Sequence, residues 1–380
     1  MSDRLEGSAL NVIICLPYLA DGGISRIALL LASGLVERGH NVSVVLHESG
    51  AGPSLPIPQG LRVVYHSDGP YRRWRLPSLS VFTLAHVLGA DVVIAASEGR
   101  AGILSLLAGA LVRRPVIGWI HFDWREFGRL VSGRTRIGLE LYRSAARVVA
   151  VSQGALDGIS EVAGLDQNLA LVIPNGVPVE EVARRAVEPL PMEFEQAFSG
   201  PSIVAVGRLE TQKGFDILIR ALALLRAQGR SECIVLVGRG GEQANLAALA
   251  QELGIADAVH FAGFQANPFA FMARATVVAM PSRFEGMPMA LIEALAVGAA
   301  VVASDCRSGP REVLDSGRYG LLVPVEDPKA LAAALTTLLE DESLRARLRA
   351  AAPVRAAEYD DEGFIARWEA LVHEVSASQR

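Results

Sequence analysis

Short apolar runs alternate with amphipathic stretches along the chain. In the first half, residues 11–17 (NVIICLP) have the pattern of a buried strand, and residues 26–39 that of a helix closed by glycine. Further strand-like runs follow: NVSVVLH, LRVVYH, DVVIAAS, PVIGWIH and RVVAVS. Because these runs are continuously apolar, we expect strands buried on both faces. The pattern predicts a parallel α/β sheet with helices on each side.

The same pattern begins again after a proline-rich, polar connection at residues 172–201. The second series of strand-like runs is SIVAVGR, CIVLVG, AVHFAG, TVVAMPS, AVVASD and GLLVPV. We therefore predict two doubly wound, Rossmann-like domains that face each other across a cleft, 1–178 and 179–357. Residues 358–380 are expected to form a last amphipathic helix. In such sheets, ligands bind beyond the carboxyl ends of the strands.

Length and composition agree with this organisation. A chain of 380 residues is long enough for two domains, and 51% hydrophobic with 20% charged residues is typical of a globular protein. The net charge of -5 argues against a nucleic-acid-binding protein. Residues 71–147, however, hold twelve arginines and five acidic residues. That excess is either a set of scattered solvated charges or a surface for phosphates or anionic lipid.

Cysteines and apolar runs indicate the compartment. Cys15, Cys233 and Cys306 are far apart and outside any CxxC pair, which fits a reducing cytosol and disfavours a structural metal site. The first residues lack the pattern of a secretory signal, and no apolar run approaches the roughly 18–20 residues of a membrane span. We expect a cytoplasmic protein that can sit on the inner face of the membrane.

Two cations follow the first strand of the second domain. In VGRLETQKGFDILIRAL, Arg208 comes after the strand and Lys213 opens the next helix. Cations beside the amides of a helix N-terminus suit a diphosphate. The alternative is a pair of ordinary surface side chains.

Two carboxylates, Glu285 and Glu293, lie in PSRFEGMPMALIE. Pro288 fits the first turn of a helix, which leaves the amides around Gly286 and Met287 to meet an anion. Glu285 then precedes the helix and Glu293 lies in its second turn, where carboxylates can accept hydrogen bonds from hydroxyl groups of a sugar or a ribose. A structural cap is the alternative role for Glu285.

The first domain offers two weaker signals. Gly22 and Gly23, between the first strand and helix, permit close approach of the main chain to a ligand, although no full GxGxxG is present. His121 ends the strand-like run PVIGWIH. A histidine at the carboxyl end of a strand is a candidate ligand contact, with a structural role as the alternative.

These motifs together resemble a known family. The order GG, strand-end histidine, VIPNGV (172–177), VGRL…KG, FAGF (261–264) and FEGMPMALIEA is similar to that of the retaining glycosyltransferases of family 4, which have the GT-B fold. The resemblance covers nearly the whole chain and is weaker in its first third. It implies that the last helix packs back on the first domain.

The resemblance also implies roles for the motif residues. Arg208 and Lys213 would hold the donor diphosphate, and Glu293 the ribose. Glu285, with the amides near Gly286, would hold the donor sugar. Gly22 and Gly23 would approach the phosphates, and His121 would contact the sugar and support the transition state. The catalytic residues so implied are His121, Glu285, Arg208 and Lys213, and the donor-binding residues are Gly22, Gly23, Arg208, Lys213, Phe264, Glu285, Gly286, Met287, Pro288 and Glu293.

The expected reaction moves a hexose or N-acetylhexosamine from a UDP- or GDP-sugar to a glycan or lipid-linked acceptor. Leaving-group charge must be stabilised by a metal or by fixed cations. The chain has no DxD motif, so we expect fixed cations, no metal and no cofactor. An anionic membrane surface is a candidate partner, and nucleic acid is not.

One stretch departs from the family pattern. Where many relatives have Gly-Gly-x-Pro-Glu, residues 308–312 read SGPRE. This variant resembles bacterial enzymes of polysaccharide and lipid-linked oligosaccharide synthesis. Two alternatives stay open: a nucleotide-sugar 2-epimerase of the same fold, and a catalytically silent nucleotide-sugar-binding subunit. A nicotinamide dehydrogenase is disfavoured, because its glycine fingerprint is missing.

Overall fold

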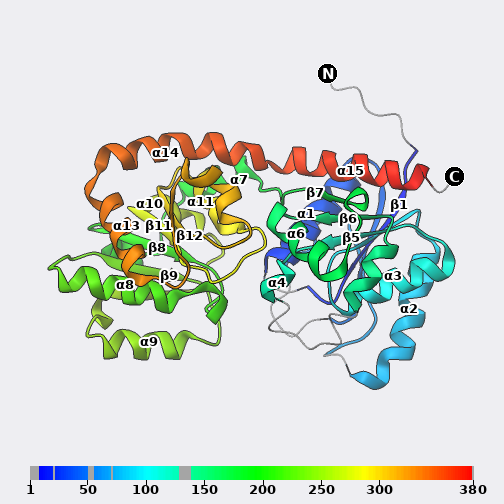
Figure 1. Cartoon of the computed structure of the whole chain (residues 1–380), viewed down its shortest axis with the longest axis horizontal. Coiled ribbons are helices and arrows are strands. Elements are labelled where there is room, and N and C mark those ends of the chain that lie inside the picture. The colour runs from blue at the N-terminus through cyan, green and yellow to red at the C-terminus, as the bar shows by residue number, and fades with distance from the viewer. Residues whose placement is uncertain (1–7, 20–21, 50–54, 70–71, 128–137, 379–380) are drawn as a thin grey trace. The chain divides into compact units, whose positions relative to one another are not determined.

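The computed structural model describes residues 8–19, 22–49, 55–69, 72–127 and 138–378 (Figure 1). The chain divides into two compact units. Unit 1 comprises Met1–Gly176 and Asp361–Arg380, and unit 2 comprises Val177–Asp360. Each unit is built around its own parallel sheet.

Unit 1 contains a seven-stranded parallel sheet in the order β3-β2-β1-β4-β5-β6-β7. The order reverses between β1 and β4, so the loops after these two strands diverge there. Polar loops at such a switch point are where Rossmann-like sheets bind ligands. The strands are β1 (Asn11–Leu16), β2 (Asn41–Leu46), β3 (Arg62–Tyr65), β4 (Val92–Ala95), β5 (Val116–Ile120), β6 (Arg147–Ala150) and β7 (Ala170–Val172).

Helices connect these strands in the described part of unit 1. The helix predicted at residues 26–39 begins three residues earlier, at Gly23, because the extended Gly22 before it serves as the N-cap. The helices are α1 (Gly23–Glu37), α2 (Leu76–Leu88), α3 (Arg100–Val112), α4 (Trp124–Phe127), α6 (Gln153–Ala163) and α15 (Asp361–Ala377), with the 3-10 turns η1 (Arg73–Arg75), η2 (Glu140–Ser144) and η3 (Gln167–Leu169).

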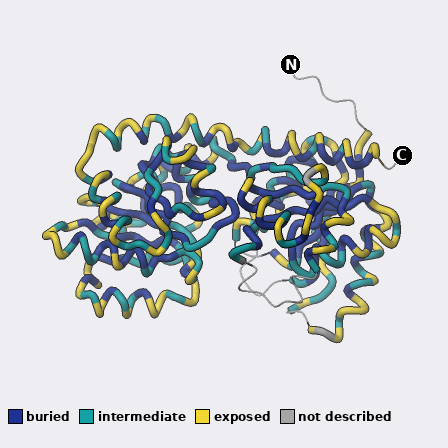
Figure 2. Tube along the Cα trace, in the orientation of Figure 1, coloured by how far each residue is buried: buried dark blue, intermediate teal, exposed yellow. Residues whose placement is uncertain are grey.

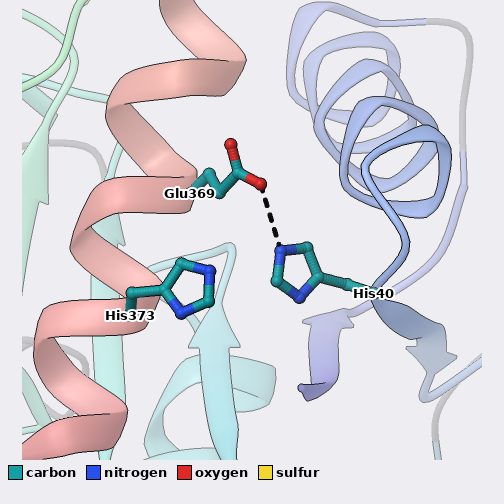
Figure 3. A group of neighbouring side chains, drawn as sticks. All are labelled: His40, Glu369 and His373. Atoms are coloured by element: carbon teal, nitrogen blue, oxygen red, sulfur yellow. Dashed lines mark hydrogen bonds and ion pairs between the residues drawn. The ribbon is translucent and has the colours of Figure 1, made fainter. Parts of the chain in front are cut away.

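The last helix, α15, is part of the core of unit 1. Trp368 and Phe364 are fully buried, and Trp368 packs on Trp119 of β5 with ring centroids 4.6 Å apart. Gly34 of α1 meets Ile365 so closely that an added Cβ would lie 2.3 Å from its side chain. At the polar edge of this contact, Glu369 lies beside His40 (Figure 3). The helix is therefore anchored by aromatic packing on the N-terminal half of the chain.

Unit 2 contains a six-stranded parallel sheet in the order β10-β9-β8-β11-β12-β13, with its switch point between β8 and β11. The strands are β8 (Ser202–Val206), β9 (Cys233–Val237), β10 (Val259–Gly263), β11 (Val277–Met280), β12 (Val301–Ser304) and β13 (Leu321–Val323). The helices are α7 (Val179–Ala186), α8 (Phe215–Ala227), α9 (Gln243–Glu252), α10 (Phe269–Arg274), α11 (Met289–Ala296), α12 (Pro310–Val313), α13 (Pro328–Glu340) and α14 (Glu342–Ala356). The 3-10 turns are η4 (Met192–Phe198), η5 (Thr211–Lys213), η6 (Ala256–Ala258), η7 (Asp315–Gly317) and η8 (Ala357–Tyr359).

The continuous apolar strands form the two cores. In each unit the buried residues follow the sheet and the exposed residues lie on the outer faces of the helices (Figure 2). Each predicted strand-like run contains a strand, and the predicted α/β class is confirmed. Among the described strands one was missed: β7 has three half-buried residues, and its last residue falls in the stretch 172–201 that the sequence pattern assigned to the connection. Among the described helices, none has the length and apolar content to cross a bilayer.

Candidate functional site

The predicted cation and carboxylate of unit 2 lie together at its switch point. Lys213 ends η5, after β8, and Glu285 lies between β11 and α11. The Lys213 Nζ is 2.6 Å from the Glu285 Oε1, and the Ser282 hydroxyl donates to the same oxygen at 2.7 Å. Glu285 is only 6% exposed. The topology thus joins two motifs that are 72 residues apart in the chain.

Burial makes this ion pair more than a surface contact. A desolvated carboxylate is costly unless it is paired and hydrogen-bonded, and Glu285 has both kinds of partner. Its carboxylate is paired with Lys213 and Ser282, and the N-cap position of α11 is held by Pro288. The pair holds a carboxylate and an ammonium group where hydroxyl and phosphate groups of a ligand would bind.

Arg208 lies in the loop between β8 and η5 and is half exposed. Its guanidinium donates to Glu210 at 2.8 Å and to Gln212 at 3.4 Å. Gln212 in turn donates to the main-chain carbonyl of Phe284, next to Glu285. A chain of hydrogen bonds therefore connects Arg208 to the carboxylate loop, and the exposed guanidinium can still reach an anion.

The segment before α11 is held by close main-chain contacts. Pro288 is the N-cap of α11, immediately before the first helical turn in which the sequence placed it, and its carbonyl accepts a hydrogen bond from the Leu291 amide at 2.9 Å. Met287 is buried, and the Ser308 hydroxyl donates to the carbonyl of Gly286 at 2.9 Å. Glu293 lies half-buried on α11, as expected for its second turn.

Ser308 and Gly309 belong to the stretch that departs from the family pattern. Gly309 has φ +92°, and an added Cβ would lie 2.5 Å from the Pro288 Cδ and 2.9 Å from the Gly286 carbonyl oxygen. Only glycine fits such a conformation and such an approach. The variant turn therefore braces the Gly286–Pro288 main chain.

Sequence reasoning missed Arg283, which fastens the two switch-point loops together. Its guanidinium makes two hydrogen bonds of 2.8 Å to Asp216 at the start of α8, one of 2.8 Å to Glu326, and one of 2.7 Å to the Thr211 carbonyl. Burial acts to raise the pKa of Asp216, but the hydrogen bonds and charge of Arg283 outweigh it, so the pKa is lowered. The feature of the sequence that could have indicated Arg283 is its place inside the carboxylate motif.

Phe264 is not part of this cluster. It follows β10, two strands from β8, and the Arg239 guanidinium lies 4.8 Å from its ring centroid. A hollow of about 170 Å³ lies between η5, α8 and α9, and its wall includes Glu210, Asp216 and Glu242. Three carboxylates suit a diphosphate poorly, so the Lys213–Glu285 pair is the better candidate for a donor site.

In unit 1, His121 follows β5 and is 5% exposed. Burial lowers its pKa to about 3, and a hydrogen bond to the main chain of Ala96 only partly opposes this, so the ring is neutral. Within the described residues its Nε2 has no hydrogen-bond partner. The ring packs on Trp119, with centroids 4.8 Å apart. A neutral, fixed imidazole can exchange a hydrogen bond with a hydroxyl group, but it adds no positive charge.

A buried carboxyl group beside His121 was also missed. Glu98 lies three residues beyond β4 and is 4% exposed. Its Oε1 accepts the main-chain N–H groups of His121 and Phe122. Burial raises the pKa of Glu98 to about 7, although these amides act to lower it. The sequence held no motif around Glu98 that could have revealed it.

Gly22 and Gly23 lie at the start of α1, beyond β1. Gly22 is extended, and an added Cβ would have nothing within 4 Å. Nothing in the described chain therefore requires glycine at position 22. The open space is compatible with the close approach of a ligand to the main chain.

The basic segment of residues 71–147 is not one uniform surface. Arg100, Arg125 and Arg147 pair with Glu48, Asp123 and Glu374. Arg129, Arg134 and Arg136 lie outside the described residues. Arg113 and Arg114 line a hollow of about 310 Å³ beside the start of β5, at the sheet edge opposite His121. Three of the twelve arginines are therefore paired locally with carboxylates.

Three potential metal ligands gather where α15 meets unit 1. His40, Glu369 and His373 have ligand atoms within 4.8 Å of one another (Figure 3). However, the Leu10 amide donates to the Nδ1 of His40, so the neutral ring carries its proton on Nε2, which faces Glu369 at 3.3 Å. A metal at Nε2 would have to displace that proton and break the Leu10 bond. The group is satisfied as a structural network.

Comparison with known proteins agrees with the fold. Residues 21–181 match the family model Glycosyltransferase Family 4, and residues 194–355 match Glycosyl transferases group 1. The phosphatidyl-myo-inositol mannosyltransferase of Mycolicibacterium smegmatis is 31% identical over 376 residues, 92% of this chain and 89% of that protein. The chain belongs to glycosyltransferase family 4.

Other similar proteins differ in how much of the chain they share. The N-acetylgalactosamine-N,N'-diacetylbacillosaminyl-diphospho-undecaprenol 4-alpha-N-acetylgalactosaminyltransferase of Campylobacter jejuni is 33% identical over 220 residues, which span 58% of each chain. The Anabaena protein HepE, solved with UDP-glucose, has a TM-score of 0.81 at 23% identity over 97% of this chain and 100% of its own. This likeness confirms the GT-B class with its two Rossmann-like domains.

Proposed function

We propose that this family 4 member transfers a hexose or N-acetylhexosamine from a nucleotide-diphosphate sugar to a glycan or lipid-linked acceptor, with retention at the anomeric carbon and without a metal. The observation that carries the proposal is the buried Lys213–Glu285 pair at the switch point of unit 2, with Arg208 beside it. Glycoconjugate synthesis in the cytoplasm is the setting that we propose.

The relatives support this choice of substrates. The mycobacterial relative is named a phosphatidyl-myo-inositol mannosyltransferase, and the Campylobacter relative acts on a diphospho-undecaprenol acceptor. HepE was solved with UDP and with UDP-glucose. A nucleotide-sugar donor and a lipid-linked or glycan acceptor are the common theme, and the base and sugar for this chain are left to experiment.

The chemistry assigned to unit 2 is leaving-group stabilisation. Breaking the anomeric bond leaves negative charge on the diphosphate and an oxocarbenium-like sugar. Lys213 and Arg208 supply fixed positive charge for that diphosphate. Glu285 orients Lys213 and accepts a hydroxyl of the donor sugar through its remaining acceptor capacity, while Glu293 accepts from the ribose.

The other candidate residues have supporting roles in this proposal. The main chain at Gly286–Pro288, braced by Ser308, lines the sugar, and Phe264 is a donor-binding residue outside the Lys213–Glu285 cluster. Gly22 and Gly23 allow a phosphate to approach α1. His121 exchanges a hydrogen bond with a sugar hydroxyl, and its neutral state leaves charge compensation to Arg208 and Lys213. Retention follows from attack on the face that the leaving phosphate occupies, with a phosphate oxygen taking the acceptor's proton.

The first test is a thermal-shift screen with UDP-, GDP- and ADP-sugars. A ligand that binds only the folded protein raises its stability by mass action, by about 2.7 kcal/mol at a hundredfold excess over Kd. The stabilising donor is then incubated in radiolabelled form with and without acceptor glycans. Transfer to acceptor supports the proposal, whereas epimerised donor or binding without turnover would establish one of the two alternatives.

We also propose that unit 1 docks on anionic membrane beside a lipid-linked acceptor. The candidate element is the stretch YRRWRLP, of which Tyr71 lies outside the described residues. Trp74 is 72% exposed with Arg75 packed 5.1 Å from its ring centroid, and Leu76 and Val81 are also exposed. Exposed tryptophan beside arginine is typical of membrane-surface segments.

Flotation with liposomes tests the membrane proposal. We expect binding to vesicles with anionic lipid that weakens with salt and with Trp74→Ala. Equal recovery on neutral and anionic vesicles at low salt would refute it.

A further inference from the structure

Glu98 differs from the other buried ionisable groups discussed above because its carboxyl group accepts hydrogen bonds from main-chain amides. Its Oε1 accepts the N–H groups of His121 and of Phe122, the latter at 3.1 Å, and these are the first two residues after β5. A buried carboxyl group is expensive and is retained where its acceptor oxygens are used. The use here is to fix the turn that carries His121.

The segment that holds Glu98 is itself rigidly placed. The hydroxyl of Tyr142, a fully buried residue, donates to the Ser97 carbonyl at 2.9 Å. Gly102 packs so closely that an added Cβ would lie 2.0 Å from that carbonyl oxygen and 2.5 Å from the Tyr142 hydroxyl. The main chain at Glu98 is therefore held in place, and its carboxyl group binds the turn after β5.

We propose that Glu98 is the positioning residue for His121, because accepting two consecutive main-chain N–H groups where β5 ends sets the orientation of the imidazole. This inference rests on the proposed function of His121 in donor-sugar contact. A carboxylate is a stronger acceptor of N–H than a carboxylic acid. The grip on the turn therefore depends on whether Glu98 is ionised.

Glu98 is placed to change charge near neutral pH. Burial raises its pKa to about 7. Two titratable neighbours, Tyr142 and His121, do not change charge in that range. Burial raises the pKa of Tyr142 far above neutrality, and burial lowers that of His121 to about 3. Asp123, in the turn itself, is paired at 2.7 Å with Arg125 of α4.

The test compares Glu98→Gln with Glu98→Ala in the full chain. The amide oxygen of glutamine can still accept both N–H groups but cannot titrate, whereas alanine removes the acceptor. Amide 1H–15N shifts of His121 and Phe122 are followed from pH 5.5 to 8.5. We expect a titration with a midpoint near 7 in the wild type that is absent in Glu98→Gln. Glu232→Gln, at a buried carboxylate paired with Arg230 in unit 2, is the matched control and should leave the titration intact.

Donor turnover is measured on the same variants. Glu98→Gln should keep kcat within about threefold while its pH profile flattens around 7, and Glu98→Ala should lose about tenfold or more in kcat with little change in KM. Persistence of the amide titration in Glu98→Gln, or an unchanged kcat in Glu98→Ala, would overturn the proposal. If no variant, wild type included, turns over a donor, the proposed function fails and the amide titration still decides whether Glu98 holds the turn.

Discussion

Lys213 and Glu285 form an ion pair of 2.6 Å between the loop that follows β8 and the loop that follows β11. These are the two central strands of the unit 2 sheet, and their loops diverge at the switch point. The Ser282 hydroxyl donates to the same carboxylate oxygen at 2.7 Å. A ligand that enters here meets an ammonium and a carboxylate that already fix each other, so little side-chain ordering remains to be done on binding.

Substitutions that remove the charges of this pair should distinguish its contribution to transfer from its contribution to stability. Lys213→Met leaves the buried Glu285 without its cation and should lower both the free energy of unfolding, by about 3–5 kcal/mol, and transfer, by about 10²–10³-fold. The double variant Lys213→Met/Glu285→Gln should recover most of the stability and none of the transfer. Unfolding followed by calorimetry, and transfer from the identified donor, measure the two effects.

The outcome for the double variant is the informative one. If it regains transfer together with stability, the pair is a structural brace and the site assignment is wrong. Glu285→Gln alone should keep the Ser282 contact and fold normally, which makes it the control for side-chain volume.

Arg208 gives the opposite expectation for stability. Its partners Glu210 and Gln212 are local and its side chain is half exposed, so Arg208→Ala should change the free energy of unfolding by less than about 0.5 kcal/mol. Transfer should nevertheless fall about 10²-fold or more, because a fixed cation for the diphosphate is lost. Arg226→Ala is the control. Arg226 lies in the last turn of α8, far from the start of that helix, and pairs with Asp257. Normal turnover in Arg208→Ala would exclude it from the donor site.

The sequence was sufficient for the described strands other than β7 and for the motifs that follow them. Buried parallel strands have continuous apolar runs, and the loops that follow them hold the side chains that bind ligands. Arg208, Lys213 and Glu285 could therefore be named before any contact was known. The contact between Lys213 and Glu285 could not be foreseen, because it depends on which strands are neighbours. That order, β8 beside β11, is set by crossovers rather than by local pattern.

The residues that were missed share a different property. Glu98 and Arg283 act through partners that are distant in the chain, His121 for the first and Asp216 and Glu326 for the second. Glu98 stands in no motif, and Arg283 stands inside the carboxylate motif without a spacing that assigns it a partner. Local periodicity shows whether a position is buried, but the partner that makes a buried charge tolerable comes from tertiary structure.

Gly309 allows a test of the turn that departs from the family pattern. Gly309→Ala strains a main chain with φ +92° and also drives a Cβ to 2.5 Å from the Pro288 Cδ. Gly317→Ala, at φ +99°, has the first problem without the second, since nothing lies within 4 Å of its Cβ. Both variants should lose about 1–2 kcal/mol of stability through the strained main chain.

Donor affinity should distinguish these two glycine variants. Gly309→Ala displaces the Gly286–Pro288 segment and should weaken donor binding, whereas Gly317→Ala should bind like the wild type. Calorimetric titration of the stabilising donor provides the measurement. Equal affinities in the two variants would mean that the segment before α11 does not contact the donor.

Chelation tests whether fixed cations replace a metal. With Arg208 and Lys213 as the positive charge for the leaving diphosphate, transfer should be unchanged by EDTA and by added magnesium or manganese. A loss of turnover on chelation that either ion restores would contradict this mechanism, whatever the effects of the two substitutions.

Glu98 also predicts an unusual dependence of stability on pH. Its pKa is about 7 in the folded state against an ordinary value of 4.5, so between these values the folded state binds a proton that the unfolded chain has released. The free energy of unfolding therefore falls as pH rises through this window, by about 3 kcal/mol from this group. The buried His121 and His47, with pKa values of about 3 and about 4 because burial disfavours their charged forms, act in the opposite direction and destabilise the fold as pH drops below 6.5.

The variant Glu98→Gln removes only the contribution of Glu98. Its free energy of unfolding relative to wild type should therefore increase as pH rises from 4.5 to 8. All four tryptophans, Trp74, Trp119, Trp124 and Trp368, lie in unit 1, so urea unfolding followed by fluorescence reports this unit alone. A stability difference between variant and wild type that is independent of pH would show that Glu98 titrates at its ordinary value and that its burial carries no electrostatic cost.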